Sequence, residues 1–110
     1  MATYVPKRAD IVWLDFSPQS GHEQAGKRPA LVLSPEEYNR KSSLLIACPI
    51  ASKVKGYPFE VTLKGKRVDG VVLSDQVKSL DWKVRKAAFV ERAAAPVMKQ
   101  VQNKLLLLIE

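Results

Sequence analysis

The first predicted strand is marked by alternating apolar side chains over residues 10–16, DIVWLDF. Because successive side chains of a strand point to opposite faces, Val12 and Leu14 would lie on one face, and Ile11 and Trp13 on the other. Further apolar runs bounded by prolines and turn residues predict strands over residues 29–33, 44–49, 59–63, 70–77 and 87–92. The first two of these runs are continuously apolar, which is typical of strands covered on both faces.

The end of the chain has a helical period instead. From Pro96 onward, apolar residues recur at steps of three and four, which predicts an amphipathic helix through Val101 and Leu105. A short helical turn is also expected, with Ser34 as its N-cap and Pro35 at its first position. Five or six strands and one terminal helix indicate a mainly β fold with a C-terminal helix (α+β), a small barrel on which the helix packs.

Composition limits the classes of function. The length of 110 residues suits one domain, residues 1–110. One histidine and one cysteine, Cys48, argue against a zinc site and exclude an intramolecular disulfide, so we expect no metal and no cofactor. The longest strongly apolar run has five residues, 105–109, and the first residues lack a signal-peptide core, so we expect a cytoplasmic protein with no membrane partner. The formal net charge of +7 favours an anionic partner.

The long loop over residues 17–28 carries the densest chemistry. Its Gly21, Gly26 and Lys27 have the spacing of a phosphate-binding P-loop, but Arg28 and a predicted strand follow where that motif needs Ser or Thr and a helix. RNA cleavage through the 2′-hydroxyl needs a base, an acid and cations that hold the phosphorane. The guanidinium of Arg28 suits the phosphorane.

Two residues of this loop are candidates for proton transfer. Glu23 is a possible base, although neighbouring cations should lower the pKa of its carboxyl group. His22 has an ordinary pKa of about 6.5, the best match to neutral pH. The alternative is that Glu23 and Arg28 form an ordinary surface ion pair.

The remaining candidates each have a structural alternative. A buried, inert thiol is the expectation for Cys48, and core packing is the expectation for Trp13 and Trp82, with base stacking as the alternative. Several cations gather near predicted turns and would form either a solvated face or a groove that follows RNA phosphates: Lys53, Lys55, Lys64, Lys66 and Arg67.

Four blocks of sequence resemble the MazF/PemK toxins of bacterial type II toxin–antitoxin systems: residues 10–16, 21–35, 55–61 and 70–82. The resemblance implies an SH3-like small β-barrel of the kind also found in CcdB, and a homodimer. It implies a metal-independent, sequence-specific endoribonuclease (an mRNA interferase) that cleaves single-stranded RNA to 2′,3′-cyclic phosphate and 5′-hydroxyl ends. A MazE-type antitoxin with an acidic tail would be the second partner.

The same resemblance assigns site residues. The catalytic arginine of the family falls on Arg28 and its loop glutamate on Glu23. The family threonine whose hydroxyl assists at the scissile phosphate falls on Ala51, so Ser52 is the candidate replacement. The RNA-binding candidates are His22, Gln24, Lys27, Lys53, Lys55, Asp75, Gln76 and Lys78.

Two other functions remain as alternatives. A catalytically weakened relative would bind RNA or antitoxin without cleavage, and the missing hydroxyl at Ala51 favours this reading. A CcdB-like gyrase poison would share the fold, but its activity does not require the Glu23 and Arg28 loop.

Overall fold

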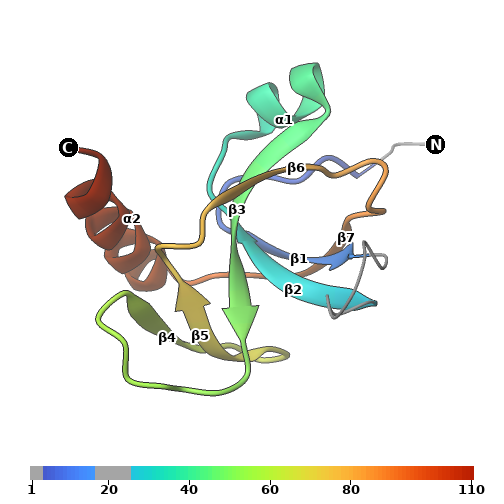
Figure 1. Cartoon of the computed structure of the whole chain (residues 1–110). Helices are drawn as coiled ribbons and strands as arrows, with labels where there is room; N and C mark the ends of the chain where they lie inside the picture. The colour runs from blue at the N-terminus through green and yellow to red at the C-terminus, as the bar shows by residue number, and fades with distance from the viewer. Residues whose placement is uncertain (1–3, 17–25) are drawn as a thin grey trace, which may run out of the picture.

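The computed structural model describes residues 4–16 and 26–110, and in these it has seven strands and two helices (Figure 1). In chain order these are β1 (Asp10–Asp15), β2 (Lys27–Val32), α1 (Glu36–Ser42), β3 (Leu44–Ala51), β4 (Glu60–Lys64), β5 (Asp69–Leu73), β6 (Lys78–Asp81), β7 (Ala88–Arg92) and α2 (Ala95–Ile109). The mainly β fold with a C-terminal helix is therefore confirmed.

The single strand expected over residues 70–77 is wrong. β5 ends at Leu73, and the backbone N–H of Gln76 donates to the Leu73 carbonyl at 3.1 Å, which closes a turn before β6 begins at Lys78. β5 pairs with β4, whereas β6 pairs with the first half of β3. The turn therefore moves the chain from one part of the sheet to another.

All strands pair antiparallel, in the order β4-β5-β3-β2-β1-β7, with β6 on β3. The long strand β3 joins the two parts of this curved sheet (Figure 1). Its residues 44–47 pair with β6, residues 47–49 with β2, and residues 50–51 with β5. A single strand thus pairs with three others, and Ala47 pairs with β6 and β2 at the same time.

Side chains of β1 contribute to two separate apolar clusters, one on each face of the strand. Ile11 belongs to the cluster beneath α2, together with Leu31, Cys48, Ile50, Val61, Leu63, Val72, Met98 and Val101. Val12 and Leu14 belong to the opposite cluster, with Ala30, Val32, Leu45, Ala47 and Trp82. The predicted alternation of β1 is confirmed, and so is core packing for Trp82. The same expectation is wrong for Trp13, whose side chain is 36% exposed.

The prediction that Ser34 caps α1 is also wrong. The N-cap is Pro35, and no side chain makes a capping hydrogen bond. The Ser34 hydroxyl donates instead to Asn39 Oδ1 at 2.6 Å and accepts from the backbone N–H of Ile46 at 2.8 Å. Asn39 is fully buried, and its Nδ2 donates to the Pro6 carbonyl at 2.9 Å. Ser34 therefore satisfies a buried polar group.

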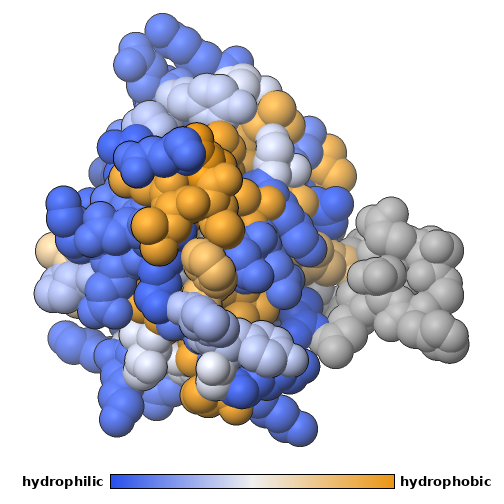
Figure 2. All heavy atoms as spheres, turned by 60° about the vertical axis from the view of Figure 1, so that its left-hand side comes forward, coloured by the Kyte–Doolittle hydropathy of each residue, from blue (hydrophilic) through white to orange (hydrophobic). Residues whose placement is uncertain are grey.

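Helix α2 begins one residue before the predicted start, at Ala95, and packs against β4. Met98 and Val101 are buried, and Leu105 packs against the same cluster. The last apolar residues are exposed: Leu106, Leu107, Leu108 and Ile109. Apolar atoms gather in the view that brings α2 forward (Figure 2). Across residues 4–16 and 26–110, no helix combines the length and apolarity that crossing a membrane requires.

Candidate functional site

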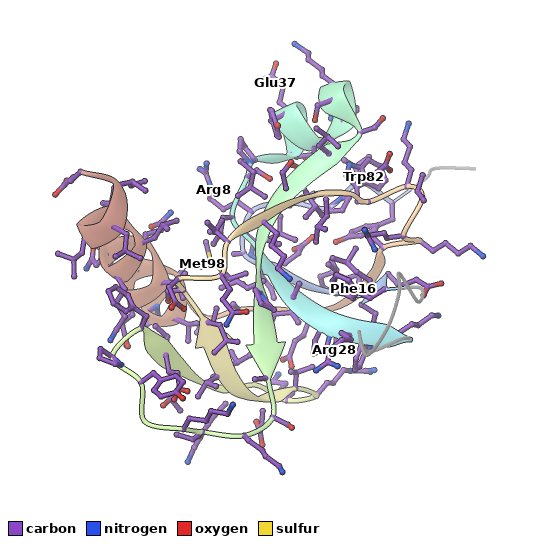
Figure 3. All side chains as sticks on the ribbon, viewed as in Figure 1. Arg8, Phe16, Arg28, Glu37, Trp82 and Met98 are labelled. Atoms are coloured by element: carbon purple, nitrogen blue, oxygen red, sulfur yellow. The ribbon has the colours of Figure 1, made fainter. Side chains whose placement is uncertain are left out.

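A groove of about 350 Å³ opens where β2 and β3 separate. Its walls are formed by β1, β2, the end of β3 with the residue after it, the turn between β4 and β5, and the first residue of β5: Trp13, Lys27, Arg28, Pro29, Ile50, Ser52, Arg67, Val68 and Asp69. Arg28 lies on β2 at the same end of the molecule as the C-terminal end of β3 (Figure 3). The groove thus combines residues that are far apart in the sequence.

The strand pairing explains why a groove forms at this place. The ladder between β2 and β3 ends at the pair Ala30 and Pro49. The next residue of β2 is Pro29, which has no N–H to donate to a neighbouring strand. Beyond that point Ile50 and Ala51 pair with β5, which lies on the other side of β3, and no residue of β2 is in register with them. The two strands therefore diverge, and the space between them is open to solvent.

The cations of the groove take part in none of the ion pairs between described residues. Salt bridges between residues of the described part of the chain join Arg40 to Glu36, Lys41 to Glu37, and Arg92 to Asp10. None of these includes Lys27, Arg28 or Arg67. Arg28 is half-buried in register with Leu14, whereas Lys27 is exposed. These groups can therefore bind an anionic ligand.

Ser52 and Ala51 differ in their relation to the groove. Ser52 lines it together with Ile50, whereas Ala51 does not. Ala51 is the last residue of β3 and lies opposite Val71. Gly70 holds this end of β3 close, because a Cβ at Gly70 would lie 2.1 Å from the Ala51 carbonyl oxygen and the glycine has a φ of +153°. Because side chains alternate along a strand and Ile50 lines the groove, Ser52 lies on the groove side and Ala51 on the opposite side.

Two basic residues of the loop that follows Ser52 are close to the groove in the sequence but do not line it. Lys53 and Lys55 are exposed and do not line it. The backbone N–H groups of Lys55 and Gly56 donate to the Glu60 carboxylate at 3.0–3.2 Å, which fixes this loop. Their assignment to RNA binding stays a prediction.

Asp75, Gln76 and Lys78 follow β5 and are exposed outside the groove. Asp75 affects the thiol of Cys48: burial, and then the charge of Asp75, raise the pKa of Cys48 to about 11. Cys48 is fully buried and so is neutral at pH 7. These properties agree with the prediction that Cys48 is a buried, inert thiol.

His22, Glu23 and Gln24 lie outside the described residues, so their roles stay predictions. The sequence placed Arg67 among five cations that would form either a solvated face or a phosphate groove, did not indicate Asp69, and favoured core packing over base stacking for Trp13. The cluster of basic residues at 64–67 was the signal for Arg67, but the sequence did not show which of its side chains reaches the groove. In the described part of the chain no group of three His, Cys, Asp or Glu side chains is arranged to hold a metal ion.

Comparison with known proteins identifies the class. Residues 7–109 match the family described as the PemK-like, MazF-like toxins of type II toxin–antitoxin systems. The chain is 45% identical to the endoribonuclease toxin MazF of Escherichia coli over 109 residues, covering 99% of this chain and 98% of that protein. It is 32% identical to the Escherichia coli endoribonuclease PemK, covering 90% and 78%.

Solved structures agree with this assignment. MazF in a MazE–MazF crystal structure from Deinococcus radiodurans is 53% identical, covers 97% of each chain and superimposes with a TM-score of 0.91. The chain therefore belongs to the PemK-like, MazF-like toxin family of type II toxin–antitoxin systems.

Proposed function

We propose that this protein is an endoribonuclease toxin that cleaves single-stranded RNA in the groove between β2 and β3. The 2′-hydroxyl oxygen attacks the adjacent phosphorus and the bond from phosphorus to the 5′-oxygen breaks. The 2′-hydroxyl proton passes to a base, and an acid protonates the 5′-oxygen. The products are a 2′,3′-cyclic phosphate and a 5′-hydroxyl, and no metal ion takes part.

The convergence of Arg28 and Ser52 on one groove carries this proposal. In the proposed reaction Arg28 stabilises the phosphorane, because its planar guanidinium donates two hydrogen bonds to phosphate oxygens. Ser52 donates a further hydrogen bond, Lys27 binds a neighbouring phosphate, and Glu23 is the base. His22, Gln24, Lys53, Lys55, Asp75, Gln76 and Lys78 complete the RNA contacts as the strand leaves the groove.

We also propose how the protein assembles, where it acts and what inhibits it. The protein acts in the cytoplasm as a homodimer of one toxin domain spanning residues 1–110, and a MazE-type antitoxin inhibits it. The net charge of +7 supports both anionic ligands, RNA and an acidic antitoxin segment. A structure with MazE is known for the Deinococcus radiodurans relative.

A catalytically weakened relative is the second candidate, and Ala51 in place of the family threonine is the observation that favours it. In that case RNA or antitoxin binds and cleavage is slow. Gyrase poisoning loses its basis, because the chain belongs to the PemK-like, MazF-like toxin family and its relatives MazF and PemK of Escherichia coli are named endoribonucleases.

The test is incubation with a long single-stranded RNA in EDTA, with single-stranded DNA and an RNA duplex of the same sequence as controls. We expect cleavage of the single-stranded RNA alone, and 5′-hydroxyl ends that polynucleotide kinase labels directly. RNA bound without being cut would instead identify the weakened relative. Cleavage that needs Mg²⁺ would contradict the mechanism.

Arg28→Ala tests the role of the arginine. An interaction made mainly in the transition state should affect the rate more than the affinity, so we expect the single-turnover rate to fall about 10²–10³-fold. The matched control is Lys41→Ala, which removes one positive charge from exposed α1 outside the groove. Equal losses of rate and affinity in Arg28→Ala would make Arg28 a phosphate anchor only.

A further inference from the structure

A carboxylate from β7 holds the turn between β4 and β5 that forms one wall of the groove. Glu91 Oε1 accepts a hydrogen bond from the backbone N–H of Lys66 at 2.9 Å. Its Oε2 accepts from the backbone N–H groups of Arg67 at 2.8 Å and Val68 at 2.9 Å. Three successive N–H groups thus surround one carboxylate, an arrangement that favours an anion. These bonds and the charge of Arg67 hold the pKa of Glu91 below its usual range.

Two neighbouring residues fix this turn further. A Cβ at Gly65 would lie 2.3 Å from Glu91 Oε2, so a residue with a side chain would displace the carboxylate. The Gly65 N–H donates to the Val68 carbonyl at 2.9 Å, and the Val68 side chain is buried in the cluster beneath α2. The conformation of the turn is therefore determined on both sides of Arg67.

The conformation of this turn determines which of its cations lines the groove. Arg67 and Lys66 are adjacent exposed cations on the same turn, but they face different surfaces. Arg67 lines the groove with Arg28, whereas Lys66 lines a separate pocket beside Glu91 and Arg92. Within residues 4–16 and 26–110, no salt bridge includes Arg67. Arg67 is therefore available to bind an anionic ligand in the groove.

We propose that Arg67 binds an RNA phosphate next to the scissile one, and that Glu91 is a positioning residue that acts through Arg67 by holding the turn. This inference rests on the proposed RNA cleavage and adds a residue that reads the flanking backbone. A flanking phosphate keeps its charge throughout the reaction. Arg67 therefore contributes to RNA affinity, in contrast to Arg28, which acts on the rate.

The charge of Glu91 makes the positioning role testable. Glu91→Gln raises the net charge of the protein by one, so a purely electrostatic effect would strengthen RNA binding. The glutamine retains one acceptor oxygen, but its NH₂ group cannot accept hydrogen bonds from the backbone N–H groups. The turn therefore loses part of the set of three hydrogen bonds that holds it. The positioning role therefore predicts weaker RNA binding, opposite in sign to the electrostatic effect.

The experiment measures single-turnover cleavage over a range of protein concentrations, giving a half-saturating concentration and a saturated rate. We expect Arg67→Ala to raise the half-saturating concentration about tenfold and to change the saturated rate by less than about threefold. It should also reduce the slope of log affinity against log salt by about 0.7, as expected for one lost phosphate contact to a single strand. Lys66→Ala, the matched loss of charge on the same turn, should have less than half these effects on affinity and slope.

The second arm is a double-mutant cycle. Glu91→Gln alone should raise the half-saturating concentration about threefold, with melting temperature measured in parallel. In the Arg67→Ala background the same change should leave affinity unchanged or slightly higher, because the group it positions is gone. Equal weakening in both backgrounds would assign Glu91 to general stability and overturn its positioning role. Equal effects of Arg67→Ala and Lys66→Ala, in a wild-type protein that cleaves RNA, would overturn the role of Arg67, whereas no cleavage by the wild type would overturn the proposed function.

Discussion

Replacing Ser52 by alanine tests which residue supplies the hydroxyl that relatives place at Ala51. Ile50 and Ser52 both line the groove, and Ala51 between them does not. Val71 opposite Ala51 is buried, so a larger side chain at position 51 would enter the packed space beside Val71 rather than the groove. We therefore expect Ser52→Ala to slow cleavage and Ala51→Thr to leave it without a gain.

The expected loss of rate in Ser52→Ala corresponds to the loss of one hydrogen-bond donor, the Ser52 hydroxyl. A hydroxyl that donates to a charged phosphorane oxygen in the transition state contributes about 2.7–4 kcal/mol, which is about 10²–10³ in rate. Ser52 is exposed and is not part of either apolar cluster, so its loss should cost less than about 0.5 kcal/mol of stability. Rate and stability should therefore separate.

The assay is single-turnover cleavage at saturating protein, with thermal unfolding of each variant. Ser52→Thr is the matched control, because it keeps a hydroxyl at the same position and should retain activity within about tenfold. If Ala51→Thr accelerates cleavage about 10²-fold and Ser52→Ala has no effect, the alternation of side chains at the end of β3 is not as we interpret it. If neither change alters the rate, the groove hydroxyl has no role in the reaction.

Three further predictions concern the interior. Asn39→Ala removes three side-chain hydrogen bonds, to the Ser34 hydroxyl and to the carbonyls of Pro6 and Ser34. We therefore expect the free energy of unfolding to fall by about 3 kcal/mol and the melting temperature to fall by about 10–15 °C. Exposed Asn103→Ala is the control, and a similar shift in both variants would refute the role of the buried network. Cys48 should resist iodoacetamide in the native protein at pH 8, where a pKa of about 11 leaves about one thiol in a thousand ionised. Because this pKa is raised in the folded state from a usual value of 9.0, the thiol should also lower stability as pH rises from about 9 to about 11, and a Cys48→Ala variant that keeps the whole slope would contradict this.

The sequence predicted the features that depend on local periodicity. Alternation assigned Ile11 and Val12 to opposite faces, and the three- and four-residue steps predicted α2. The cap of α1 failed because Ser34 has a tertiary alternative, the buried amide of Asn39, that no local pattern contains. The strand expected over residues 70–77 failed because an apolar residue, Val77, continues the pattern through a turn.

The site was predicted only in part, for a related reason. Arg28 and Lys27 belong to one unusual loop, and Ser52 was found through a family resemblance. Arg67 was one of several cations near turns, and its position depends on the hydrogen bond that its backbone N–H donates to Glu91, 24 residues away in the chain. Pairings at such separations carry no periodic signal, so the structure was needed to select Arg67.

The pairing of β1 with β7 has a consequence for how the protein is made. Asp10 lies opposite Arg92, so the first strand of the sheet gains this neighbour only after more than four-fifths of the chain has been synthesised. Contacts between such distant segments close slowly, because the loop entropy is lost before the contacts form. A nascent chain on the ribosome therefore lacks the complete sheet until β7 emerges. A toxin with this topology becomes active only as a finished chain, and fragments from interrupted translation should not fold into an active groove.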